Sequence, residues 1–453
     1  MKPQGRDTEL LSARGEALIG REEDRHLVPV PAREVQAARQ TRGTHKGMPL
    51  QRYLSMLGPG LVAGASDNDP TTVAALAVLG ASFGYGLSWL TILLFPMLAT
   101  IQMIGAQVGV VARRSLQRVV RDRYGRGWGM LLLLSVVSVN LVTIAADLEA
   151  GAAALGLLFH AAWQWFVIPF ALAMLAMMTV GTYAHLQRTL QVVLLIFAAY
   201  IFSAFAAHPD WGAVLHATIF PPISLHSDYV KGALALLGTT VTAYVYVWET
   251  IGQAEQRAPI RALGAAKADA ALGMFVAVGV FWFILIATGA TLGAHHEQVQ
   301  TAQQAAQALG PIAGPLAGDL FAVGLLASAI LAVPVLAATT AYMLGGQFNW
   351  RRSLSERIGT ARYFYAALAG SLLVTVPVSF AGVSPIQLLI WASVAGGIGT
   401  PVGLAFLLLT ARDRRVMGDY PIGKVLTWVG WATTLLISVI SVYFLYQQFW
   451  SMV

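Results

Sequence analysis

Asp67-Asn68-Asp69-Pro70 interrupts the first long apolar segment of this 453-residue chain. A carboxylate is costly in hydrocarbon, and a proline inside a helix removes a backbone hydrogen bond. Membrane segments tolerate such a break where the freed backbone lines a site for a polar solute. The tetrad therefore predicts a broken membrane helix with a binding site at the break, most simply for a cation.

The composition is that of a membrane protein. Charged residues are 11% of the chain and hydrophobic residues 57%, whereas charged residues make up about 25% of soluble domains. The chain has no cysteine, which excludes disulfides and thiolate metal sites. Residues 1–50 are polar and mixed in charge, and we expect them to form a disordered cytoplasmic tail.

Eleven apolar spans follow the tail, so we predict an all-α polytopic membrane domain over residues 51–450. Their starts lie near Tyr53, Tyr85, Trp128, Trp163, Thr189, Val230, Asp269, Pro315, Tyr363, Pro385 and Val425. With the amino terminus inside, every one of the 29 lysines and arginines except Lys231 falls in the tail or an inner loop. The positive-inside rule therefore predicts a cytoplasmic amino terminus and an external carboxyl terminus in a bacterial inner membrane. This topology explains the net charge of +7, and we expect no nucleic-acid partner.

Eleven spans divide into five, five and one, and two units with an odd number of spans lie in opposite orientations. We place the repeats at about 53–207 and 230–410, with an extra span at about 425–449. The second repeat opens with span six, where the run Gly238-Thr239-Thr240-Val241-Thr242 is poorly suited to helix. Broken spans one and six would enclose a central site, and a continuous span six with small polar packing residues is the alternative.

Five carboxylates lie within the spans, and no lysine, arginine or histidine lies at comparable depth. They are Asp67, Asp69, Asp147, Glu149 and Glu249. Buried carboxylates without basic partners must be protonated, hydrated or neutralised by a bound cation, which disfavours an anion carrier. Carboxylate, hydroxyl and carbonyl oxygens together suit Mg²⁺, Ca²⁺ or Mn²⁺.

The two aspartates of the tetrad are the predicted metal ligands. Asp69 is the primary ligand and also the expected N-cap of a half-helix that starts at Pro70, although a pure cap is the alternative. Asp67 would bind directly or through water, or would face water only. Asn68 would support the site from beside it.

The remaining carboxylates are candidates for an ion path. Asp147 and Glu149 are two residues apart and face different directions on a helix, so at most one lines a path. We favour Asp147 for proton or ion passage over a simple hydrogen bond between helices. Glu249 would lie in an inner vestibule or at a hydrated exit face, nearly two turns past the break.

Several strings carry a family resemblance: Gly58-Pro59-Gly60-Leu61, Asp69-Pro70, Gly80-Ala81-Ser82-Phe83-Gly84-Tyr85, Ala146-Asp147-Leu148 and Leu320-Phe321-Ala322-Val323-Gly324-Leu325-Leu326-Ala327-Ser328. They resemble the natural resistance-associated macrophage protein (Nramp) family of divalent-metal transporters, over about residues 53–449. The resemblance implies a leucine-transporter-type fold of two inverted five-helix repeats, with metal bound between spans one and six.

The chain departs from the family pattern at the metal ligands. The family's Asp-Pro-Gly-Asn is here Asp69-Pro70-Thr71-Thr72, so the aspartate stays and Thr72 replaces the asparagine ligand. The family's Met-Pro-His is here Thr242-Ala243-Tyr244, which loses the soft thioether and the histidine. Oxygens near Thr242 would complete the shell, and Tyr244 would gate or support it. The string from Gly64 to Pro70 is similar to the branch that includes magnesium transporters.

We therefore predict a secondary transporter that imports Mg²⁺, Mn²⁺ or both by alternating access. The metal is the substrate rather than a cofactor, and a monomer would suffice for transport. The alternative is a transporter of an amino acid or another organic solute, whose carboxylate the paired aspartates would repel. An enzyme is not expected, because the nearest string to an intramembrane protease Gly-x-Gly-Asp motif, Leu316-Ala317-Gly318-Asp319, lacks the first glycine.

Overall fold

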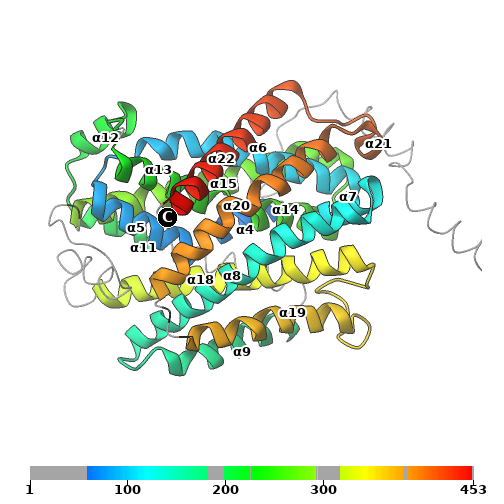
Figure 1. Cartoon of the computed structure of the whole chain (residues 1–453), viewed down its shortest axis with the longest axis horizontal. Helices are drawn as coiled ribbons and strands as arrows, with labels where there is room; N and C mark the ends of the chain where they lie inside the picture. The colour runs from blue at the N-terminus through cyan, green and yellow to red at the C-terminus, as the bar shows by residue number, and fades with distance from the viewer. Residues whose placement is uncertain are drawn as a thin grey trace, which may run out of the picture. The chain divides into compact units, whose positions relative to one another are not determined.

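The computed structural model describes residues 59–180, 198–224, 226–291, 293, 317–381, 383 and 385–450. Every regular element within these ranges is a helix (Figure 1). The predicted tail and the predicted starts of spans one, five and eight, near Tyr53, Thr189 and Pro315, lie outside the described residues.

The helices of the first half of the chain include both parts of the broken first span. They are α4 (Pro59–Ser66), α5 (Pro70–Phe83), α6 (Trp89–Ala112), α7 (Leu116–Tyr124), α8 (Arg126–Leu158), α9 (Gln164–Val180) and α11 (Ala198–Ala206). The second half contains α12 (Trp211–Ile219), α13 (Ser227–Thr240), α14 (Ala243–Gln256), α15 (Leu263–Thr291), α18 (Ala317–Phe348), α19 (Arg362–Thr375), α20 (Pro385–Arg412), α21 (Arg414–Met417) and α22 (Lys424–Trp450), with 3-10 turns at Ile260–Ala262 and Val376–Phe380. Among the described residues, eight helical segments are long and apolar enough to cross a membrane.

Most predicted spans start close to an observed helix, and span seven is the exception. Its helix, α15, begins at Leu263, whereas the sequence placed the start near Asp269. Asp269 is instead buried inside the helix, because its Oδ2 accepts a hydrogen bond from the Gly60 N–H at 2.9 Å.

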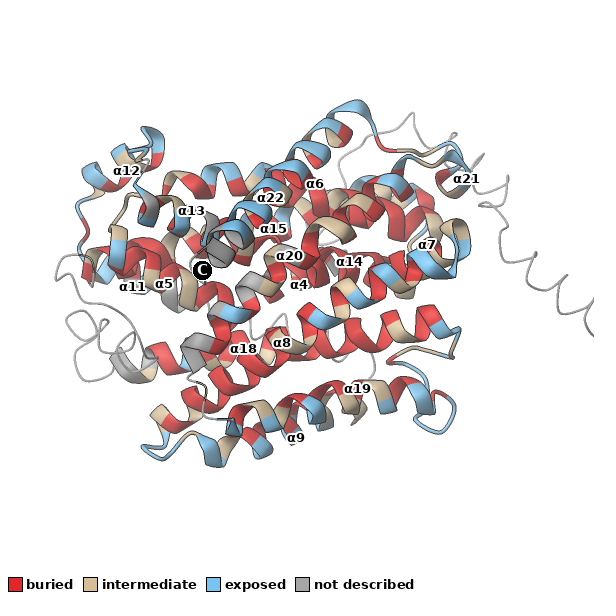
Figure 2. Ribbon diagram, in the orientation of Figure 1, coloured by how far each residue is buried: buried red, intermediate tan, exposed pale blue. Residues whose placement is uncertain are grey.

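The helices bury their inward faces (Figure 2), and many of the exposed side chains on the outer helices are large and apolar. The long helix α18 is buried along most of its length and packs on α8, which also packs on α20. The outer helix α22 exposes apolar side chains such as Leu435, Val439 and Val442. Exposed apolar side chains suit a helix that faces lipid. The helix also satisfies its own backbone N–H and C=O groups, which lipid cannot do.

The first half of the broken span, α4, is pressed against α15 through glycines. Gly60 and Gly64 are four residues apart and so lie on one face of α4. A Cβ on Gly64 would overlap the Gly273 backbone, and a Cβ on Gly273 would overlap the Gly60 carbonyl. Small residues at this spacing let two membrane helices approach closely. The contact holds α4 against α15. Because α4 ends at Ser66, it also positions the tetrad that begins at Asp67.

Replacing Gly273 with leucine should therefore destabilise the protein by about 2 kcal/mol or more, because the side chain has no room. The matched control is Gly279→Leu on the same helix, where an added Cβ meets no atom within 4 Å. We expect the control to keep the parent's melting temperature in detergent. Equal melting temperatures for the two variants would contradict the close helix contact.

Candidate functional site

The break in span one has the local structure that the sequence predicted. Asp69 is the N-cap of α5, with φ −68° and ψ 162°, and its Oδ1 accepts the Thr72 N–H at 2.7 Å. Pro70 stands in the first turn, where its missing N–H leaves no bond unmade. The three residues Asp67, Asn68 and Asp69 therefore connect two half-helices rather than continue one.

The break in span six is also confirmed. Helix α13 ends at Thr240 and α14 begins at Ala243, so Val241 and Thr242 form the interruption. The Thr240 hydroxyl donates to the Leu236 carbonyl at 2.8 Å. Thr242 has the extended conformation of an N-cap, but its side chain caps no backbone N–H. Its hydroxyl is thus directed to another partner.

Three side chains, those of Tyr244, Thr72 and Thr242, join the two breaks. The Tyr244 Oη lies 2.6 Å from the Ser66 carbonyl oxygen and 3.2 Å from Asp69 Oδ2. The Thr72 hydroxyl donates to the Thr239 carbonyl at 3.3 Å. The Thr242 Oγ1 lies 3.5 Å from Asp67 Oδ1. The structure therefore brings together the predicted ligands Asp67, Asp69, Thr72 and Thr242.

The site is closed to solvent and rich in unsatisfied oxygen. Asp67 and Asp69 are each 1% exposed. Asp67 Oδ2 and Asn68 Oδ1 are buried without a hydrogen-bond partner. None of the ion pairs found in the described residues involves Asp67, Asp69 or Asp147. A bound cation would offset the cost of burying these carboxylates.

The freer carboxylate oxygen belongs to Asp67, because both oxygens of Asp69 already have hydrogen-bond partners. Each carboxylate oxygen carries two lone pairs, so Asp69 retains the capacity to bind a metal ion. The described residues contain no cluster of three or more Asp, Glu or His side chains arranged to hold a metal. A complete shell in this geometry would need hydroxyl, carbonyl or water oxygens as well.

Asp147 is hydrogen-bonded to a residue of the site, whereas Glu149 and Glu249 have no hydrogen bond to the site in the described residues. Asp147 Oδ1 accepts a hydrogen bond from the Thr71 hydroxyl at 3.2 Å, and its Oδ2 is buried without a partner. Both oxygens of Glu149 are buried without a partner. Glu249 accepts from the Gln253 amide at 2.9 Å and is 0% exposed, so it is not at a hydrated exit face in this structure.

Sequence reasoning missed three residues that contact the site. Thr71 carries the link to Asp147, Thr239 accepts from Thr72, and the Ser328 hydroxyl donates to the Asn68 carbonyl. Ser328 lies on α18, far from the tetrad in sequence. A hydroxyl in an apolar helix is visible in the sequence, but its partner is not.

Two broken helices that meet at buried carboxylates inside a helical membrane bundle define an inverted-repeat transporter. The family model for natural resistance-associated macrophage protein-like proteins matches residues 60–447. The chain belongs to this family. The predicted family and fold class are thereby confirmed, and since the family is one of transporters, the chain is not an enzyme.

Individual relatives agree with the family match. The divalent metal cation transporter MntH of Mycobacterium tuberculosis is 27% identical over 402 residues, which cover 86% of this chain and 91% of the relative. A manganese transporter of Eremococcus coleocola matches the structure with a TM-score of 0.74 at 18% identity, covering 88% of this chain and 87% of that one. Mhp1, a nucleobase-cation-symport-1 family transporter, matches with a TM-score of 0.56 at 14% identity, covering 86% and 93%. The structural matches establish the fold alone.

Proposed function

We propose that this chain imports divalent metal cations across the membrane as its substrate, by alternating access around the two breaks. The observation that carries the proposal is the pair of buried aspartates, Asp67 and Asp69, with no ion-pair partner among the described residues. Membership of a family whose relatives are named divalent metal cation transporters supports it. Asp67 and Asp69 are the proposed carboxylate ligands, with Thr72 and Thr242 beside them.

We further propose that the ions carried are hard ones, Mg²⁺ as well as Mn²⁺. The side chains at the two breaks offer carboxylate, hydroxyl and amide oxygens, and Thr242 stands where the family has its methionine. Oxygen ligands suit both ions, whereas a thioether favours softer transition metals. Asp147 is the proposed ion or proton path residue, because Thr71 connects it to the tetrad.

The proposed topology has the amino terminus in the cytoplasm of a bacterium and the carboxyl terminus outside. Four loops expected on the inner face gather at one end of the bundle, where α7 and α21 lie, opposite α12 (Figure 1). Arg123 of one loop pairs with Asp413 of another at 2.6 Å. This gathering agrees with the distribution of lysine and arginine in the sequence.

Uptake into proteoliposomes tests the proposal. We expect Mg²⁺ and Mn²⁺ to compete with each other within about tenfold of equal potency, because an all-oxygen site discriminates little between them. Internal pH recorded in the same vesicles shows whether protons accompany the metal. Uptake of amino acids without uptake of metal would instead support the organic-solute alternative, as would thermal stabilisation by amino acids alone.

A further inference from the structure

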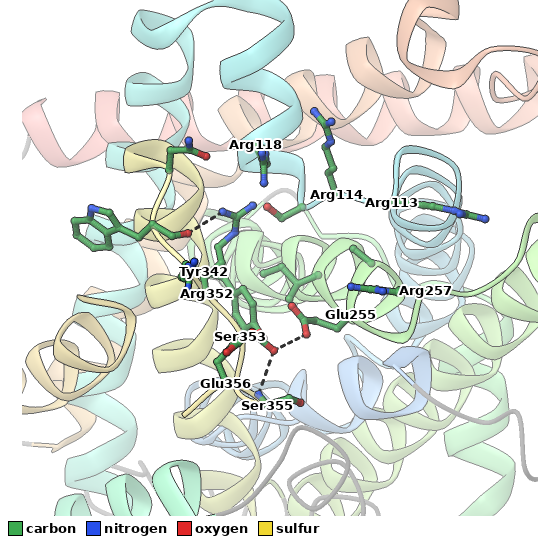
Figure 3. A pocket seen from close by; sticks show the side chains of 16 residues that line it. Arg113, Arg114, Arg118, Glu255, Arg257, Tyr342, Arg352, Ser353, Ser355 and Glu356 are labelled. Atoms are coloured by element: carbon green, nitrogen blue, oxygen red, sulfur yellow. Dashed lines mark hydrogen bonds between the residues drawn. The ribbon is translucent and has the colours of Figure 1, made fainter. Parts of the chain in front are cut away.

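A cavity of about 790 Å³ lies at the arginine-rich end of the bundle, and none of its lining residues belongs to the two breaks. Figure 3 shows the side chains that line it. The cavity is open on one side and is lined by the start of α7, the end of α14 and the loop 349–361 between α18 and α19. Its volume falls in the range of sites that bind small molecules. Six arginines line it: Arg113, Arg114, Arg118, Arg257, Arg351 and Arg352.

The cavity carries an excess of positive charge. Its lining contains two carboxylates, Glu255 and Glu356, against the six guanidinium groups. Glu255 accepts a hydrogen bond from the Ser353 hydroxyl at 2.7 Å. Burial, and then the like charge of Arg118, lower the pKa of Arg352 to about 10, so Arg352 stays protonated at neutral pH. Like charges held close in a confined space attract an anion.

A neighbouring carboxylate outside the cavity is shared and does not remove this excess. Asp122 lies 3.2 Å from Arg114, 3.5 Å from Arg118 and 2.9 Å from Arg121. Arg118 Nε is buried and makes no hydrogen bond in spite of that ion pair. One carboxylate thus serves three arginines, two of which line the cavity.

Ser115, at the amino-terminal end of α7, adds a hydroxyl donor to the same cavity. Ser115 has the extended conformation of an N-cap, with ψ 150°, but its hydroxyl caps no N–H. The side chain is 5% exposed, lines the cavity and has no hydrogen-bond partner at Oγ. The Leu116 N–H already donates to the Thr250 Oγ1 and the Arg118 N–H to the Ser115 carbonyl. The helix end therefore adds its dipole, which favours negative charge, and the Ser115 hydroxyl.

Two of the arginines occupy strained backbone positions. Arg113 and Arg257 have φ values of 53° and 49°, and each ends a helix that opens onto the cavity. Glycine or asparagine is the favoured residue at such a helix end. The same conformation occurs at His160 and His208, which do not line the cavity. It therefore ends the two helices at the cavity and does not by itself indicate binding.

We propose that this cavity binds a phosphate-bearing anion, held by the Ser115 hydroxyl and the guanidinium groups of Arg118 and Arg352. A guanidinium group can donate two hydrogen bonds to the oxygens of one phosphate. The Ser115 hydroxyl, which has no partner in the structure, can donate a third. The anion is either a free phosphate compound or the headgroup of an anionic lipid. It would connect α7, α14 and the loop 349–361, which belong to different repeats. The proposal is independent of the metal site and goes beyond metal transport.

Calorimetric titration of the full-length protein in detergent tests the proposal, with inorganic pyrophosphate in one arm and short-chain phosphatidic acid in the other. We expect one site per chain in at least one arm. Arg118→Gln should weaken binding about tenfold or more, and Ser115→Ala several-fold, because each removes a hydrogen bond to a charged group. Ser115→Ala breaks no hydrogen bond of its side chain in the structure, so it should keep the parent's melting temperature.

The matched control is Arg357→Gln, which removes the same charge from the loop 349–361 at an exposed position outside the cavity lining. Its affinity should stay within about twofold of the parent's. Binding in the pyrophosphate arm alone would identify a free phosphate compound, and binding in the lipid arm alone a headgroup. Absence of binding in both arms, or equal losses in Arg118→Gln and Arg357→Gln, would overturn the proposal.

Discussion

Asp69→Asn should reduce divalent-metal uptake about 100-fold or more while leaving the fold intact. Asparagine is as good an N-cap as aspartate, and its side-chain oxygen can accept the Thr72 N–H that Asp69 accepts at 2.7 Å. The substitution therefore removes a negative charge from the break and keeps the helix start. Initial rates of Mn²⁺ and Mg²⁺ entry into proteoliposomes, together with the melting temperature, measure the two effects separately.

The chain supplies a matched control for this experiment. Asp210 is the N-cap of α12 and accepts the Gly212 and Ala213 N–H groups at 2.9 Å and 3.1 Å. It lies outside the two breaks, so Asp210→Asn should leave uptake unchanged. A folded Asp69→Asn protein that transports as fast as the parent would show that Asp69 is only a cap.

Thr242→Met should change the order of preference among ions. The side chain stands at the break in span six, and its hydroxyl lies 3.5 Å from Asp67 Oδ1. A thioether there would add a soft ligand, which the side chains at the two breaks lack. We expect the ratio of Cd²⁺ to Mg²⁺ potency, measured by competition against Mn²⁺ uptake, to rise about tenfold or more, which corresponds to about 1.4 kcal/mol.

Thr242→Leu separates the effect of sulfur from the effect of size. Leucine has a bulk similar to methionine but offers no lone pair to a metal. The leucine variant should slow transport without favouring Cd²⁺. The soft-ligand explanation fails if the methionine and leucine variants show the same ion preference.

The two breaks could be predicted because their causes are local in sequence. Proline at position 70 and the N-cap Asp69 define a helix start whatever surrounds them. The β-branched run before Ala243 lowers helix propensity in the same local way. The concentration of arginine in alternate loops likewise needs no knowledge of packing.

Contacts between distant segments could not be predicted. The hydrogen bond that the Gly60 N–H donates to the buried Asp269 joins residues 209 positions apart in the sequence. The hydrogen bond from Thr71 to Asp147 and the convergence of six arginines on one cavity have the same origin. Each depends on which helix faces which, and the pattern within a single helix does not determine that.

The position of the Tyr244 hydroxyl has a consequence for how the transporter senses its cargo. A phenol has one proton, so at any moment it is given either to the Ser66 carbonyl or to Asp69 Oδ2, which lie 2.6 Å and 3.2 Å away. If Asp69 binds the metal as proposed, the cation would compete for that oxygen and leave the proton to Ser66. Loading would then tighten the attachment of α14 to the end of α4 and loosen its attachment to α5. One hydroxyl would thereby convert ion occupancy into a choice of which half-helix α14 holds.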